Sequence, residues 1–152
     1  MVILEDTRNK KDQHEIKHAA WQAHGDTLFR CALPCGDYAL PPAVAVDTKR
    51  DMLEIAGNIG GKEHERFKRE LIRARDMGTK LYILVENEDG IRSIDDVESW
   101  INPRLTLSPK AITGVRLAKA MRTLEERYGC AFVFCMPQEA AKFVYFLLER
   151  GQ

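Results

Sequence analysis

Apolar residues follow two patterns along the chain, and each pattern predicts its own kind of element. Continuous apolar runs over residues 1–6, 80–87 and 130–136 predict buried β-strands. Over residues 62–78 and 108–129, apolar positions recur every three or four residues, which is typical of amphipathic helices. Strands and helices alternate over most of the chain. The pattern therefore predicts an α/β fold with a mixed central sheet and helices on both faces.

Two further segments have helical spacing. Residues 8–25 predict a helix with Ile16, Ala20 and Ala23 on its apolar side. Residues 138–150 predict a last helix that is apolar almost all round, for which packing in the core is the first interpretation.

Capping residues mark the ends of two other helices. Ser93, with Asp96 three positions later, predicts a helix start with an acidic first turn. Ser108 followed by Pro109 predicts the start of the long helix that precedes residue 130. Gly129 predicts the left-handed end of that helix.

The composition is that of an ordinary soluble globular protein. Of the 152 residues, 45% are apolar and 30% are charged, which suits one domain over residues 1–152. The formal net charge is zero, so nothing overall favours nucleic-acid binding and nothing argues against a local basic patch. The start of the chain does not resemble a signal peptide, and no run reaches the roughly 18 apolar residues of a membrane span. A cytoplasmic location without membrane contact is expected.

The four cysteines lie inside apolar runs, as Cys31 with Cys35 and Cys130 with Cys135. Zinc-binding pairs usually stand at turns, whereas these are embedded in strand-like sequence. Buried free thiols are therefore expected, with a zinc site as the alternative. Free thiols fit a reducing compartment.

Carboxylates stand at the edges of two predicted strands, over 27–40 and 42–50, which Pro41-Pro42 separates by a predicted turn. Asp37 lies near the end of the first strand, and Asp47 lies near the end of the second. A carboxylate beside a core costs free energy unless something pairs with it. A metal ion, a salt bridge and solvent are the candidate partners.

Asp47 and Lys49 are two residues apart, so a strand places both side chains on one face. Mg²⁺ takes one or two carboxylates and keeps several waters, so Asp37 and Asp47 could supply its protein ligands. Lys49 could then orient or deprotonate a water, or stabilise charge on a phosphate. The alternative is a surface ion pair worth about 0.2–1 kcal/mol.

The stretch "GDYALPPAVAVDTK" resembles the active-site signature of the XPF-type excision-repair nucleases, a branch of the PD-(D/E)XK nuclease superfamily. Gly36-Asp37 matches the opening Gly-Asp of that signature, and Tyr38 follows it as a supporting residue. Asp47-Thr48-Lys49 stands where the family has Glu-Arg-Lys. The resemblance implies a restriction-endonuclease-like fold.

Other stretches extend the resemblance over nearly the whole chain. "ILEDTRN" is similar to the family's first-strand motif through Asp6 and Arg8. On the helix predicted over 62–78, Arg66 and Glu70 occupy the places of an Arg and a Gln that lie one helical turn apart in the family. The later order of strand, helix, strand and helix also agrees.

The resemblance implies a metal-dependent endonuclease that hydrolyses DNA phosphodiester bonds with Mg²⁺ or Mn²⁺. Asp37 and Asp47 would hold the metal with help from Asp6, and Lys49 would position or activate the water. Arg8 would contact the phosphate or brace Asp6. Branched DNA such as flaps, forks or junctions is the implied substrate, in repair or recombination.

Four positions depart from the family pattern, and they concern substrate preference and rate. Thr48 stands for arginine, Asp47 and Asn9 each stand for a glutamate, and Leu53 stands for a later acidic residue. A catalytically inactive nuclease-fold DNA-binding or scaffold protein is therefore the alternative. An RNA nuclease of the same fold is a third interpretation.

The family's eukaryotic nucleases carry a helix-hairpin-helix module after the nuclease domain, and none is expected over residues 1–152. The chain in this respect resembles a stand-alone bacterial or phage-encoded version. Such a protein would need a basic surface, a homodimer or a replication or repair partner to hold DNA. For the last helix a dimer interface is the alternative to packing in the core, because the family's nucleases commonly dimerise through this domain.

A basic stripe on the helix over 62–78 is the main candidate surface for DNA. Its residues are Lys62, Arg66, Arg69 and Arg73. The alternative is a solvated face balanced by neighbouring glutamates. Residues 8–11 form a second basic patch, beside the predicted metal site.

Overall fold

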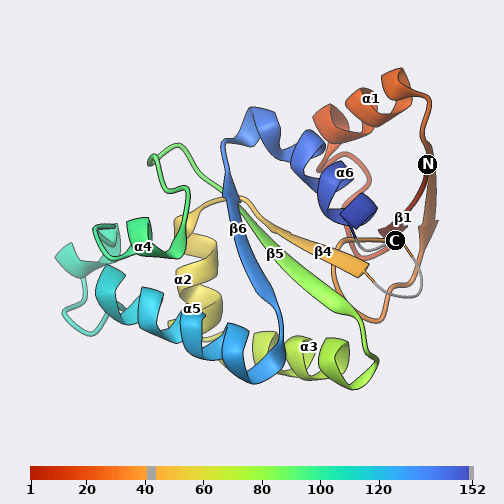
Figure 1. Ribbon diagram of the computed structural model, residues 1–152. Coiled ribbons are helices and arrows are strands. Elements are labelled where there is room, and N and C mark those ends of the chain that lie inside the picture. Colours follow the sequence, from red (N-terminus) through yellow and green to blue (C-terminus); the bar gives the residue numbers. More distant parts are fainter. Residues whose placement is uncertain (41–43, 151–152) are drawn as a thin grey trace.

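The computed structural model describes residues 1–40 and 44–150. Its centre is a six-stranded sheet in the order β2-β1-β3-β4-β5-β6 (Figure 1). β3 runs antiparallel to both of its neighbours, and the other adjacent strands are parallel. The strands are β1 (Val2–Asp6), β2 (Thr27–Cys31), β3 (Tyr38–Leu40), β4 (Val44–Lys49), β5 (Lys80–Glu86) and β6 (Ala131–Cys135). The predicted mixed central sheet is confirmed.

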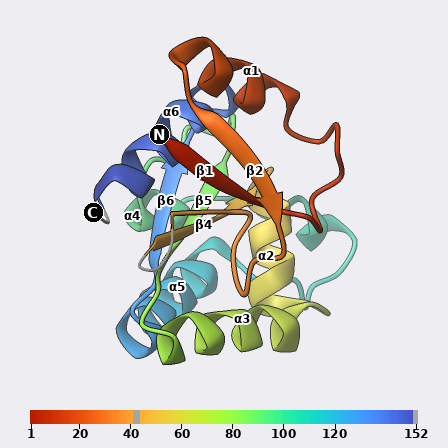
Figure 2. The same cartoon turned by 90° about the vertical axis from the view of Figure 1, so that its right-hand side faces the viewer.

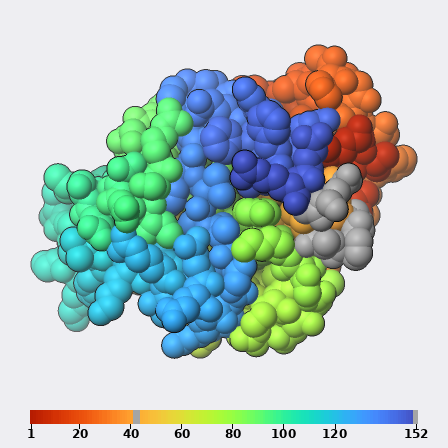
Figure 3. Space-filling model, viewed as in Figure 1, coloured from red at the N-terminus to blue at the C-terminus, as the bar shows by residue number. Residues whose placement is uncertain are grey.

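Helices cover both faces of the sheet, as predicted (Figure 2). One face carries α2 (Met52–Gly60), α3 (His64–Asp76), α4 (Ile94–Val97) and α5 (Gly114–Tyr128), and the other carries α1 (Glu15–His24) and α6 (Ala140–Arg150). Short 3₁₀ helices occupy Pro103–Thr106 and Pro137–Glu139. Figure 3 shows α6 beside α1 at the surface, over the smaller of the two cores. None of the described helices is long and apolar enough to cross a membrane.

The buried side of α1 differs from the predicted one, and the helix begins later, at Glu15. Ile16 is 80% exposed, and Ala20 and Ala23 are exposed as well. Lys17 and Trp21 are buried instead. The Lys17 ammonium lies 2.9 Å from a Glu86 carboxylate oxygen, and the Trp21 indole donates to the Ala141 carbonyl at 2.9 Å. These polar contacts hold the side of α1 that carries Lys17 and Trp21 against the sheet, and the spacing of apolar residues in the sequence does not reveal them.

The single strand predicted over 27–40 is also wrong, because the segment forms two strands, β2 and β3. β2 pairs with one side of β1, and β3 pairs with the other side. Between Cys31 and Tyr38 the chain must therefore pass from one side of β1 to the other, which one straight strand cannot do. The turn predicted at Pro41-Pro42 lies outside the described residues.

Of the predicted helix ends, two agree with the structure and one does not. Ser93 accepts from the Asp96 N–H at 3.3 Å, and Gly129 ends α5 at φ 69°, as predicted. The predicted start at Ser108 is wrong, because Thr113 caps α5 by accepting from the Arg116 N–H. Gly114 explains the later start: a Cβ there would lie 2.4 Å from the Val97 carbonyl oxygen, so only glycine lets α5 begin against α4. All four cysteines are free thiols, as expected, but only Cys35, Cys130 and Cys135 are buried, and Cys31 is half-buried.

Candidate active site

A cleft of about 460 Å³ opens where the ends of β1 and β4 meet the segment before β3 and the helices α2 and α3. The cleft gathers residues that are far apart in the sequence. Of the ten residues predicted for the site, eight line it: Asp6, Arg8, Asp37, Asp47, Lys49, Arg66, Glu70 and Arg73.

Asp37 is fixed in the sheet by its backbone. Its N–H donates to the Val46 carbonyl at 2.9 Å, and its own carbonyl accepts from the Asp6 N–H at 2.8 Å. The preceding Gly36 has φ 74°, and a Cβ there would lie 3.1 Å from the Val46 carbonyl oxygen. The Gly-Asp pair is thus a structural requirement: glycine lets the chain turn against β4, and the next residue enters the cleft.

Gly36→Ala is expected to destabilise the protein by roughly 1–2 kcal/mol more than Gly78→Ala. Both glycines have positive φ, but a Cβ at Gly78 meets nothing within 4 Å. The difference isolates the contact with β4. Urea denaturation of both variants measures it, and equal losses would show that backbone conformation alone requires Gly36.

The Asp37 carboxylate is oriented by Thr48. Its Oδ2 accepts from both the Thr48 N–H at 2.8 Å and the Thr48 hydroxyl at 2.7 Å. Burial and, after it, the charge of Asp47 raise the pKa of Asp37 to about 7, although the Thr48 bonds and Lys49 oppose that rise. At neutral pH a positive charge near this carboxylate would therefore be favoured.

Asp47 and Lys49 form a buried ion pair on one face of β4, with 2.7 Å between Nζ and Oδ2. Among the described residues, no hydrogen bond of regular geometry reaches Asp47 Oδ2, so the pair rests on charge. Burial is the largest single influence and on its own would lower the pKa of Lys49, but Asp47, Glu70 and Asp37 together outweigh it and the pKa is raised. The ammonium also lies 5.4 Å from the Phe67 ring centroid. Lys49 is therefore suited to stabilise negative charge rather than to accept a proton.

Asp6 is neutralised by Arg8, which bonds it through both backbone and guanidinium. The same guanidinium donates to the Leu33 carbonyl at 2.8 Å, so Arg8 ties the end of β1 to the segment that follows β2. Arg8 thus braces Asp6, one of the two roles predicted for it, and its side chain stays 56% exposed at the cleft.

Helix α3 contributes one carboxylate to the floor of the cleft and two cations to its rim. Glu70 accepts from the Gly36 N–H at 2.8 Å, and burial together with the charge of Asp47 raises the pKa of Glu70. Arg66 and Arg73 line the exposed rim, whereas Arg69 is exposed but does not line the cleft. Lys62 precedes α3, so two of the four residues of the predicted basic stripe reach the cleft.

Two comparisons by sequence find nothing: no family model and no curated protein matches the chain. Comparison of structures does find matches. XPF from Aeropyrum pernix aligns with a TM-score of 0.70 at 18% identity over 99% of this chain, and the same protein in complex with DNA aligns with a TM-score of 0.69 at 18% identity over 98%. This chain has the XPF-type nuclease fold. It spans 64% of the length of both matched chains.

Tyr38, predicted as a supporting residue, lies on the face of the sheet opposite the cleft. Asp37 enters the cleft, so alternation along β3 sends Tyr38 to the opposite face. There its ring packs edge-on against Trp21, with centroids 5.0 Å apart. Tyr38 belongs to the core under α1 and supports the cleft only through the backbone of β3.

Some cleft residues of this XPF-type fold were not selected from the sequence. Gln13, Glu54 and Asn58 also line the cleft. Glu54 accepts from the Arg50 N–H at 2.8 Å, and Asp51 caps α2 through the Glu54 N–H at 2.8 Å. The acidic cap pattern at 51–54 could have placed Glu54 at the first turn of a helix, but no pattern in the sequence points Gln13 or Asn58 toward the cleft.

Proposed function

We propose that the protein is a metal-dependent DNA endonuclease that hydrolyses phosphodiester bonds, with branched DNA as its substrate. The observation that carries this proposal is the convergence of Asp37, Asp47 and Glu70 in a cleft whose buried cation is Lys49. An XPF-type fold and a matched structure that contains DNA support DNA as the partner.

The donor set fits a hard divalent cation held by few protein ligands. Asp37 has a raised pKa, so its carboxylate would gain from a further positive charge. Asp47 Oδ2 has no regular hydrogen bond and is held only by the Lys49 ammonium at 2.7 Å, so a metal ion would compete with Lys49 for it. Within residues 1–40 and 44–150, no group of three or more His, Cys, Asp or Glu side chains is placed to hold a metal. Asp37 and Asp47 would therefore hold Mg²⁺ or Mn²⁺ as a pair, with waters completing the shell.

Bound in the cleft, such an ion would polarise the phosphoryl oxygen and lower the pKa of a coordinated water. The protein's own residues contribute orientation and charge. Thr48 fixes the Asp37 carboxylate, and protonated Lys49 stabilises negative charge that develops on the phosphate. Arg8 holds Asp6 neutralised at the edge of the same cleft.

The rim of the cleft is suited to the DNA backbone. Arg66 and Arg73 stand exposed on α3, and Arg50 stands 84% exposed after β4. Contacts of this kind neutralise phosphates without reading base sequence. Recognition by shape, as branched DNA requires, is consistent with such a rim.

Arg66→Ala and Arg73→Ala are each expected to weaken DNA binding by roughly three- to tenfold and to reduce the salt slope by about one. Arg69→Ala is the matched control, because it removes a cation from the same helix outside the cleft. Fluorescence anisotropy with a labelled fork at several salt concentrations measures all three. A loss for Arg69→Ala as large as the others would place the DNA elsewhere on α3.

The proposal is tested by cleavage of labelled flap, fork, four-way-junction and linear DNA with Mg²⁺, Mn²⁺ or EDTA. Asp37→Asn serves as the variant control for contaminating nucleases. Metal-dependent cutting of a branched substrate, absent in EDTA and in the variant, is expected. Binding without cutting by the folded wild type would instead favour the inactive scaffold. An RNA competitor that suppresses cutting more than DNA would favour an RNA nuclease.

A further inference from the structure

One stretch of the chain combines unpaired positive charge with exposed apolar side chains. Residues 99–124 contain no Asp or Glu, although the whole chain has 23 acidic and 23 basic residues. The stretch covers the 3₁₀ helix at Pro103–Thr106, the loop that follows it and most of α5. Its five bases are Arg104, Lys110, Arg116, Lys119 and Arg122.

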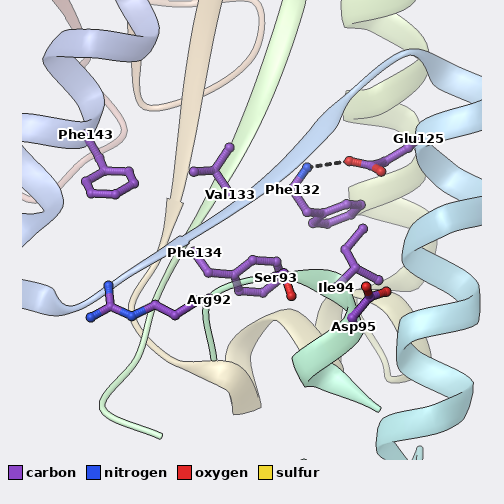
Figure 4. Close-up of a pocket in the computed structure, with 9 residues that line it drawn as sticks. All are labelled: Arg92, Ser93, Ile94, Asp95, Glu125, Phe132, Val133, Phe134 and Phe143. Carbon is purple, nitrogen blue, oxygen red and sulfur yellow. Dashed lines mark hydrogen bonds between the residues drawn. The ribbon is translucent and has the colours of Figure 1, made fainter. Parts of the chain in front are cut away.

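Within residues 1–40 and 44–150, only one of these five cations pairs with an acid. Arg122 pairs with Asp95 and Glu98. Figure 4 shows Asp95 at the groove beside β6, so the charge of Arg122 is used there. The other four cations are exposed, and no acid neutralises them.

Three large apolar side chains stand exposed among these cations. Ile101 is 81% exposed, Leu107 is 88% exposed and Val115 is 62% exposed. Single exposed apolar residues are normal on a protein surface, whereas a group of them marks an interaction site. Of the eight large apolar side chains that are exposed in the described chain, three fall within residues 101–115, so they form such a group.

Backbone contacts hold the loop and the start of α5 together. The Asn102 side chain is buried, accepts from the Arg104 N–H at 3.0 Å and donates to the Ile112 carbonyl at 3.0 Å, which closes the loop between residues 102 and 112. A Cβ at Gly114 would lie 2.4 Å from the Trp100 carbonyl oxygen, so the segments before and after the loop are in direct contact. The loop and the start of α5 therefore form one preorganised surface.

We call this surface the basic–apolar patch. Figure 3 shows residues 101–112 beside the start of α5 at the left of the view. The patch differs from the rim of the cleft, where Arg50, Arg66 and Arg73 stand exposed. Among the described residues, no large exposed apolar side chain lines that cleft. Phosphates need only the cations, whereas the patch also offers apolar area. Its residues are Ile101, Arg104, Leu107, Lys110, Val115, Arg116 and Lys119.

We propose that the basic–apolar patch binds an acidic segment of a partner protein that carries apolar side chains among its carboxylates. The carboxylates would neutralise the four unpaired cations, and the apolar side chains would cover Ile101, Leu107 and Val115. Nucleic acid would satisfy the cations but leave the apolar side chains in water. A second copy of this chain, joined through the same surface, would set the four cations against themselves, so like charges disfavour it.

The test uses the whole 152-residue chain and the synthetic peptide acetyl-Asp-Asp-Phe-Asp-Asp-Leu-Asp-Asp-Phe-amide, followed by amide NMR at low salt. Binding that shifts the amides of Leu107 and Val115 is expected. Two control peptides separate charge from apolar contact: one has Lys in place of every Asp, and the other has Ser in place of Phe and Leu. Each should bind at least roughly tenfold more weakly.

Variants of the protein test the same two contributions. Arg104→Gln with Lys110→Gln, and separately Leu107→Ser, should each weaken peptide binding roughly fivefold or more. These side chains are exposed, so the fold is retained, and unchanged melting temperatures check this. Arg127→Gln, in the last turn of α5, and Ile16→Ser, on α1, are the matched controls and should leave binding unchanged.

Other occupants of the patch give different results, and each would overturn the proposal. A loss of fork binding in Arg104→Gln with Lys110→Gln as large as in Arg66→Ala would make the patch a DNA contact. Binding to vesicles of phosphatidylserine and phosphatidylcholine that Leu107→Ser abolishes would make it a lipid contact. A dimer in sedimentation that Leu107→Ser dissociates would make it a contact between copies. Equal binding of the acidic peptide and its Ser control, or no binding of either, would also refute it.

Discussion

Asp37→Asn is expected to remove DNA cleavage by at least roughly 10³-fold and, at the same time, to stabilise the metal-free protein. The wild-type carboxylate is densely surrounded by protein, and burial and Asp47 raise its pKa to about 7. An asparagine keeps an oxygen that accepts from Thr48 but carries no charge. The variant therefore loses a metal ligand and, with it, a charge that opposes folding.

The gain in stability has a defined dependence on pH. Between the ordinary pKa of 3.8 and about 7, the native Asp37 holds a proton that the unfolded chain has released. The wild type thus loses stability as pH rises through this range, and the variant does not. At pH 8 the variant should be more stable on the order of 2 kcal/mol, since solvent in the cleft screens part of the charge, and at pH 4 the two should be alike.

Thermal or urea unfolding in EDTA from pH 4 to 8 measures this difference. Asp26→Asn is the matched control, because Asp26 is buried beside the N-terminal amine at 2.7 Å and its charge is favourable. That variant should lose stability at neutral pH. If Asp37→Asn also lost stability there, the Asp37 carboxylate would be compensated by a cation in the native protein, and the raised pKa would be wrong.

The sequence predicted β5 and β6 well because both strands form continuous apolar runs, and β5 lies inside the sheet with most of its side chains buried. It failed at α1, whose buried side is made by Lys17 and Trp21 through polar contacts with distant residues. The prediction also failed between β2 and β3, where the chain passes from one side of β1 to the other. That crossing depends on the strand order of the whole sheet. Local patterns carry no information about either.

Eight of the predicted site residues line the cleft, and strand geometry explains the position of three of them. Asp37, Asp47 and Lys49 lie in or next to paired strands, so alternation and strand order fix where their side chains point. Tyr38 was predicted only as a supporting residue, and alternation along the strand places its side chain on the face opposite Asp37. Gln13 and Asn58 reach the cleft from segments whose placement depends on packing alone.

Lys49→Met is expected to lower cleavage by roughly 10²- to 10³-fold and stability by roughly 3 kcal/mol. The lysine supplies the buried positive charge beside Asp47, and methionine fills its space without that charge. Loss of the ammonium leaves Asp47 unpaired in the interior, which explains the lower stability. Loss of charge stabilisation at the phosphate explains the slower cleavage.

Lys17→Met separates these two effects. Lys17 and Glu86 form the matching pair on the opposite face of the sheet, at 2.9 Å and with side chains 10% and 11% exposed, against 10% and 8% for Lys49 and Asp47. Both variants should lose similar stability, but only Lys49→Met should lose cleavage.

Mg²⁺ should also raise the melting temperature of Lys49→Met more than that of the wild type, because the ion no longer competes with the ammonium for Asp47. A smaller metal-induced rise in Lys49→Met would mean that Lys49 assists the metal site instead of competing with it, and Asp47 would then not be the ligand.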